Sequence, residues 1–125
     1  MKKYLFSLIA VVLALAASSF TLMKKHAPTG VYVFEYNPNG TDYSLARVTN
    51  VDKAIWVYKG IDQPMCSSIN TKACRVSVTS ADVNMTTTPY SLKASTVSIS
   101  AAPSLPSVYY VTGITGTTSA FSNKP

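Results

Sequence analysis

The sequence predicts an all-β fold, and three observations support that prediction. From residue 30 onward, apolar and polar residues alternate in short runs, which is the pattern of half-buried strands. Turn-forming residues separate these runs at a spacing of roughly 8 to 12 residues. After residue 25, no ten-residue stretch has helical periodicity. We expect a small antiparallel β-sandwich or a twisted sheet of about six to seven short strands, and the pattern does not decide between the two.

Length and charge limit the number of domains and the class of partner. A chain of 125 residues has room for one domain. The formal net charge of +6 is typical of nucleic-acid-binding proteins, yet only 13% of the residues are charged. Four of the cations flank the apolar N-terminal segment, and the others are scattered without a basic run. We therefore expect no nucleic-acid partner.

Residues 1–22 have the three parts of a secretory signal peptide: a lysine-containing start, an apolar core at 5–17 and a stretch of small residues that offers cleavage sites. We expect export to the periplasm, the cell surface or the medium. The alternative is an uncleaved helical anchor in the inner membrane, because residues 4–23 carry no charge and are long enough to span it. In that case residues 4–23 would be the chain's only contact with the membrane.

The predicted β-domain comprises residues 30–113 and follows a flexible lead-in at residues 23–29. Its first strand, residues 31–36, is apolar on both faces, which favours a central position in a sheet. Residues 37–40 (NPNG) predict a turn, because Pro fixes one φ angle and Asn-Gly tolerates positive φ. Residues 41–50 would return as a weaker strand.

The later strands have fewer apolar anchors. In residues 95–101, Val97 and Ile99 alternate with Ser and Thr, which predicts a half-buried strand. Residues 107–113 form the last segment with a convincing strand pattern. The remainder, residues 114–125, has little charge and little apolar density, and we expect a flexible tail.

Two cysteines, Cys66 and Cys74, are the sharpest chemical feature of the sequence. In an oxidising compartment, cysteines eight positions apart are most simply explained by a disulfide, which would stabilise the fold by about 2.5 kcal/mol. Structural zinc requires four such ligands, and the single histidine, His26, lies forty positions before Cys66. The C-x-x-C spacing of redox catalysts is absent. We expect a structural disulfide and no metal site.

Aromatic residues could form a flat platform for stacking sugar rings or peptides, as large amphipathic rings often do at wet interfaces. The candidates are Trp56, Tyr58 and Tyr36. In a strand, Trp56 and Tyr58 share one face, while Ile55 and Val57 share the other. Such residues more often fill the core of an all-β domain that has few leucines, and we favour that interpretation.

The sequence offers little material for catalysis, so we expect no enzyme activity, no catalytic residues and no cofactor. His26 is the single histidine and lies in the lead-in, so a Ser/His/Asp arrangement would require it to fold back onto the β-domain. The five acidic residues lie mostly in or beside predicted turns, where Asp commonly caps backbone amides: Glu35, Asp42, Asp52, Asp62 and Asp82.

The Met-Lys-Lys start with its Ala/Val/Leu-rich core, the strand that contains Trp56-Val57 and the Cys66-x7-Cys74 pair resemble a family of small exported bacterial proteins classed as a domain of unknown function. The resemblance covers the signal segment and about residues 54–78. The Thr/Ser-rich remainder from Ser80 onward departs from that family. The resemblance implies export and the disulfide, and it supplies no activity or site.

These features together predict an exported, non-enzymatic β-protein held by one disulfide, which acts as a structural or interaction module of the envelope or surface. Its partner would be an unidentified envelope or extracellular protein, or a glycan. Two alternatives remain open: a glycan- or peptide-binding module that uses the Trp56/Tyr58 face, and an assembly subunit that recruits partners by β-strand addition. Uncharged edge strands such as residues 95–101 would permit strand addition.

Overall fold

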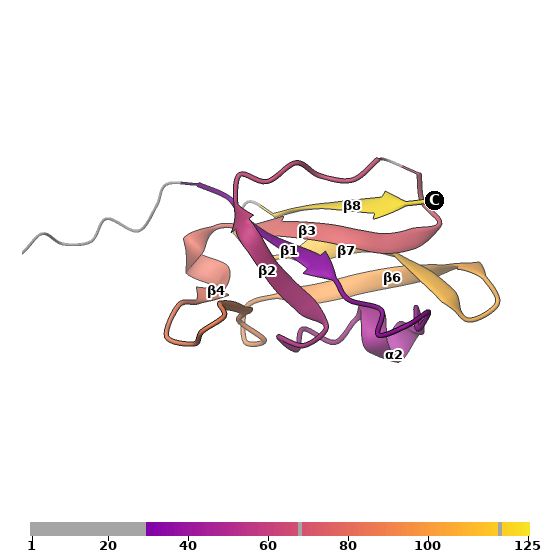
Figure 1. Cartoon of the computed structure of the whole chain (residues 1–125), viewed down its shortest axis with the longest axis horizontal. Helices are drawn as coiled ribbons and strands as arrows, with labels where there is room; N and C mark the ends of the chain where they lie inside the picture. Colours follow the sequence, from indigo (N-terminus) through magenta and orange to yellow (C-terminus); the bar gives the residue numbers. More distant parts are fainter. Residues whose placement is uncertain (1–29, 68, 118) are drawn as a thin grey trace, which may run out of the picture.

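The computed structural model describes residues 30–67, 69–117 and 119–125 (Figure 1). The predicted all-β fold class is confirmed for this part of the chain. The segments predicted as signal (1–22) and lead-in (23–29) lie outside the described residues. The strands of the described part of the chain are β1 (Tyr32–Tyr36), β2 (Trp56–Ile61), β3 (Lys72–Val78), β4 (Val83–Asn84), β5 (Ser91–Leu92), β6 (Ser98–Leu105), β7 (Val108–Thr115) and β8 (Ala120–Lys124).

Four strands form the largest sheet, in the antiparallel order β2-β1-β3-β8. The central position predicted for residues 31–36 is confirmed, because β1 pairs with β2 on one side and with β3 on the other. Phe34, for example, lies opposite Tyr58 of β2 and Val76 of β3. A strand paired on both sides favours apolar residues on both faces, as β1 has at every position except Glu35.

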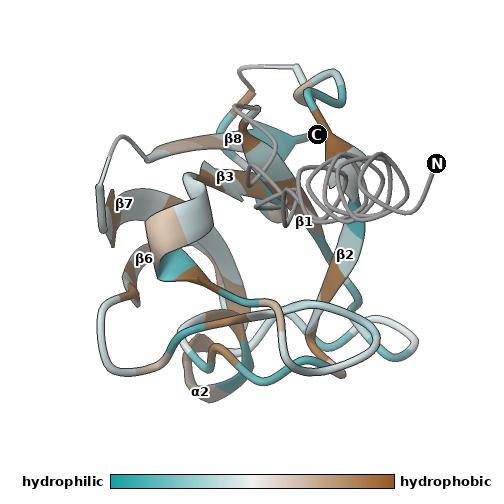
Figure 2. Ribbon diagram, turned by 90° about the vertical axis from the view of Figure 1, so that its left-hand side faces the viewer, coloured by the Kyte–Doolittle hydropathy of each residue, from teal (hydrophilic) through white to brown (hydrophobic). Residues whose placement is uncertain are grey.

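A separate antiparallel hairpin, β6–β7, faces this sheet across the core. Figure 2 shows β6 and β7 on the side of the molecule opposite β1 and β2. Val97, Ile99 and Val111 of the hairpin region belong to the same buried cluster as the side chains of the sheet. Because the sheet and the hairpin enclose one core, the arrangement is closer to the predicted sandwich than to a single twisted sheet. The short β4 and β5 form a third ladder.

Aromatic and β-branched side chains fill the core. The alternation predicted for residues 95–101 is observed, since Val97 and Ile99 are buried while Ser98 and Ser100 are exposed, but the strand itself begins at Ser98, after a turn at 94–96. The largest fully buried side chains are those of Trp56, Tyr32, Phe34, Val33, Val48, Val76, Val78, Val83 and Val111, together with Asn123. Burying side chains of this size contributes roughly 1.5 to 3 kcal/mol each.

The prediction of a strand at residues 41–50 is wrong. The turn before it forms as predicted, with positive φ at Asn39 and Gly40 (47° and 89°). After it, Tyr43 makes one isolated bridge with Val108, and Leu45–Val48 forms the single-turn helix α2. Only Val48 of α2 is buried, so one helical turn is enough to bring the single core residue inward.

The prediction of a flexible tail at residues 114–125 is also wrong, since most of that segment belongs to the fold. Strand β7 extends to Thr115, and β8 pairs antiparallel with β3. The residues of β8 buried most deeply are polar, Ser122 and Asn123. Hydrogen bonds rather than apolar side chains hold this strand, and a hydrophobic pattern does not reveal it. The β-domain therefore continues beyond residue 113, to Lys124.

Within the described residues, no helix has the length and apolar character needed to cross a membrane.

Candidate functional site

The predicted disulfide between Cys66 and Cys74 is present. Cys74 lies on β3, and Cys66 lies in the loop that leads from β2 to β3. The backbone N–H of Cys66 also donates to the hydroxyl of Ser122 on β8 at 2.9 Å. The disulfide and this hydrogen bond hold the loop against the two strands β3 and β8.

The aromatic platform considered as an alternative for Trp56, Tyr58 and Tyr36 does not exist as an exposed surface, and the favoured core position is observed for Trp56 and Tyr36. Trp56 is fully buried, and its Nε1–H donates to the carbonyl of Val48 at 3.2 Å. Tyr36 is 3% exposed, and its hydroxyl donates to the carbonyl of Asp42 at 2.6 Å. Tyr58 is half-buried. Trp56 and Tyr58 do share a face, but that face covers the core.

Tyr58 belongs to a cluster of three tyrosines on the core face of the sheet. Its ring centroid lies 6.1 Å from that of Tyr32 and 5.1 Å from that of Tyr90. Burial, with Tyr90 as a second cause, raises the pKa of Tyr32. Burial followed by the neighbouring Tyr32 also raises the pKa of Tyr58. The Tyr32 hydroxyl is buried and has no hydrogen-bond partner among the described residues. The cluster is structural, with one hydroxyl that contributes no bond.

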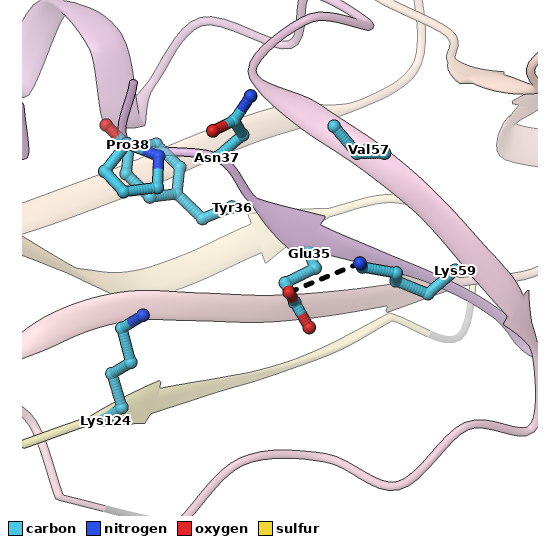
Figure 3. Close-up of a pocket in the computed structure, with 7 residues that line it drawn as sticks. All are labelled: Glu35, Tyr36, Asn37, Pro38, Val57, Lys59 and Lys124. Carbon is cyan, nitrogen blue, oxygen red and sulfur yellow. Dashed lines mark ion pairs between the residues drawn. The ribbon is translucent and has the colours of Figure 1, made fainter. Parts of the chain in front are cut away.

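The opposite face of the sheet has a groove with a volume of about 380 Å³ (Figure 3). It lies over β1 and β2, beside the turn that follows β1 and the end of β8. Its lining residues are Glu35, Tyr36, Asn37, Pro38, Val57, Lys59 and Lys124. The lining combines the apolar side chains of Pro38 and Val57 with the charged side chains of Glu35, Lys59 and Lys124.

Among the described residues that line the groove, Glu35 is the only acidic one, and two cations contact it. Its Oε2 accepts hydrogen bonds from Nε and Nη2 of Arg75 at 2.8 and 2.5 Å, and its Oε1 lies 3.5 Å from Nζ of Lys59. Burial alone would raise the pKa of the Glu35 carboxyl. The hydrogen bonds and charges of Arg75 and Lys59 outweigh burial, so the pKa of Glu35 is lowered. Glu35 is therefore ionised at neutral pH.

Lys124 contributes a further positive charge at the other end of the groove. Figure 3 shows its side chain reaching from β8 toward the turn at Pro38. Its Nζ lies 5.8 Å from the centre of the Tyr43 ring, within the range of a cation–π contact. Among the described residues, no carboxylate forms an ion pair with it.

The hydrophobic pattern of the sequence does not reveal this groove. Glu35 is the single charged residue in an otherwise apolar strand, and such a residue on a central strand is a usable signal. Lys59 shares a strand face with Val57, which the alternation of β2 also indicates. Lys124 lies in the segment expected to be flexible, so its position in the groove had no sequence signal.

A second candidate site is the outer edge of β6. This strand pairs only with β7 within the described residues, so its other edge is not part of a sheet ladder. Residues 94–123, which contain the whole hairpin, include no Lys, Arg, Asp, Glu or His. Pro103 is the one edge-protecting residue in β6, because proline lacks the N–H that a new strand would need.

The four aspartates do not converge on a shared site. As expected for turn residues, each accepts a hydrogen bond from a backbone N–H: Asp42 from Ser44 at 3.0 Å, Asp52 from Ala54 at 2.7 Å, Asp62 from Val31 at 2.9 Å and Asp82 from Thr117 at 2.6 Å. In the described part of the chain, no group of three or more His, Cys, Asp or Glu side chains lies close enough to hold a metal ion.

No protein-family model matches the chain, and no curated protein or solved structure was found to be similar to it.

Proposed function

We propose that this protein is exported and acts without catalysis, as a structural or interaction module of the cell envelope or the extracellular space. Two features support the proposal. The N-terminal sequence has the parts of a secretory signal. The disulfide between Cys66 and Cys74 is a kind of bond that persists outside the reducing cytosol.

We further propose that the module recruits a second copy of itself by β-strand addition at the outer edge of β6. The observation that carries this proposal is the combination of an unpaired edge with a stretch, residues 94–123, that has no charged side chain. Natural proteins usually protect such edges with charges, in particular lysine. Because Pro103 blocks the second half of the strand, the added strand would pair along Ser98–Ala102.

A ligand platform for glycans or peptides at the aromatic face has less support. It requires Trp56 and Tyr58 to be exposed together, and Trp56 is fully buried. Self-association at a strand edge needs no platform, since backbone hydrogen bonds supply most of the attraction.

The export proposal is tested by the intact mass of the protein from fractionated native cells, measured with and without reductant after thiol labelling. The expected result is a mass without the signal segment, with both thiols protected until reduction. A full-length mass in the membrane fraction would replace secretion by an N-terminal anchor. Free thiols in cytosolic protein would refute export.

The strand-addition proposal is tested by light scattering over a range of protein concentrations. The expected result is an oligomer that grows with concentration in the wild type and is weakened by Ser100→Lys, because a charge on the exposed edge opposes pairing. Ser95→Lys is the matched control, since Ser95 is an exposed serine in the turn before β6. A wild type that stays monomeric at high concentration would refute strand addition, and so would equal effects of both variants.

A further inference from the structure

The groove on the outer face of the four-stranded sheet has an imbalance of charge. Glu35 supplies one negative charge, and Arg75 and Lys59 both contact it. Lys124 adds a positive charge that no described carboxylate neutralises. A groove with this imbalance attracts an anion, because concave surfaces concentrate the field of the charges that line them.

The pairing of β8 with β3 places a second lysine beside Lys124 and increases the positive potential at this end of the sheet. Lys124 on β8 lies directly opposite Lys72 on β3. Like charges at paired positions of neighbouring strands repel each other and destabilise the pair. An anion bound beside Lys124 would relieve that repulsion, so binding and strand stability favour each other.

The volume and the apolar residues of the groove indicate which kind of chemical group carries the negative charge of the ligand. A volume of about 380 Å³ is at the small end of the range for ligand sites. Pro38 and Val57 provide apolar surface along the side of the groove that carries Asn37. A compact ring or short apolar group fits this surface, with its charge directed at one end.

We propose that this groove binds the carboxylate of a small ligand, with Lys124 as the partner of the carboxylate. A singly charged group matches Lys124, the one cation of the groove lining that forms no ion pair with a described carboxylate. Two sources supply this chemistry: an acidic sugar of the uronate type and the C-terminal carboxylate of a peptide. The proposal is independent of strand addition, since β6 contributes no residue to the groove.

The experiment is an amide-resolved NMR titration of the protein produced from its full sequence. The probes are glucuronate, with glucose as its neutral analogue, and an acetylated dipeptide with a free C-terminus, with the amidated peptide as its neutral analogue. The expected result is a saturable shift of the amide signals of Asn37 and Val57 with an acidic probe and no such shift with its neutral analogue. Response to one acidic probe alone supports the proposal and identifies the source.

Two variants distinguish a specific binding site in the groove from a general attraction of anions to the positively charged protein. We expect Lys124→Gln to weaken binding about three- to fivefold, as for an exposed charge pair. Lys53→Gln is the matched control, because Lys53 is an exposed lysine in the turn before β2, outside the groove. The proposal is overturned if neither acidic probe gives a saturable shift, if the neutral analogues shift the signals equally, or if the two variants weaken binding to the same extent.

Discussion

The side-chain amide of Asn123 pairs with the backbone of Val111 through two hydrogen bonds. The N–H of Val111 donates to Asn123 Oδ1 at 2.9 Å, and Asn123 Nδ2 donates to the carbonyl of Val111 at 2.9 Å. The amide thus acts as one peptide group of a neighbouring strand. It connects β8 of the large sheet to the inner edge of the hairpin and leaves β6 as the hairpin's free edge.

The first prediction concerns Asn123, which is 1% exposed. Asn123→Ala leaves the N–H and carbonyl of Val111 buried without their partner, and we expect a loss of about 2 to 4 kcal/mol in the free energy of unfolding. Urea unfolding followed by tryptophan fluorescence measures the loss. Asn70→Ala is the control, because it removes only the 3.0 Å bond between Asn70 Oδ1 and Asn123 from an exposed position. Equal losses in the two variants would contradict the role assigned to Asn123.

How much of this structure the sequence predicts depends on what holds each element. Strand β1, which is apolar on both faces apart from Glu35, and the alternating segment around Val97 and Ile99 are predictable, and so is the disulfide. Strand β8 is not, because its buried residues are Ser122 and Asn123 and its stability comes from hydrogen bonds. The shared face of Trp56 and Tyr58 is predictable from the strand period. Which face meets the core depends on the hairpin packed against it, and one strand's sequence does not contain that information.

The second prediction concerns the Tyr32 hydroxyl, which is buried without a hydrogen-bond partner among the described residues. A buried hydroxyl that makes no bond costs its desolvation free energy. Tyr32→Phe should therefore raise the free energy of unfolding by about 1 kcal/mol. Tyr36→Phe is the matched control and should lower it by about 1 kcal/mol, because the Tyr36 hydroxyl donates to Asp42 at 2.6 Å. If Tyr32→Phe also destabilises the protein, the hydroxyl has a partner in solution.

The third prediction concerns stability at high pH. Burial, the largest cause, raises the pKa of Tyr36 from 10.0 to about 12. The folded state holds this proton more tightly than the unfolded state does, so the contribution of Tyr36 is complete below pH 10.0 and is lost as the pH rises toward about 12. Tyrosinate absorbance should show a late-titrating component, to which the raised pKa values of Tyr32 and Tyr58 also contribute and which Tyr36→Phe should reduce. A variant that loses stability with pH as steeply as the wild type would contradict this assignment.

The fourth prediction concerns stability at low pH, where Glu35 acts in the opposite direction. Its pKa is lowered from 4.5, so the folded state releases this proton more readily than the unfolded state does. The contribution of Glu35 is therefore present above pH 4.5 and is lost as the pH falls through the lowered pKa.

Glu35→Gln tests this directly, since glutamine keeps the shape of the side chain and does not titrate. We expect the urea midpoint of the variant to fall less steeply than that of the wild type between about pH 5 and pH 3. Some acid dependence should remain, because hydrogen bonds from Ser44 also lower the pKa of Asp42. Parallel curves for the two proteins would mean that Arg75 and Lys59 do not favour the ionised form of Glu35. In that case the groove would contain a carboxyl that titrates in its ordinary range, and its positive potential would increase as the pH falls.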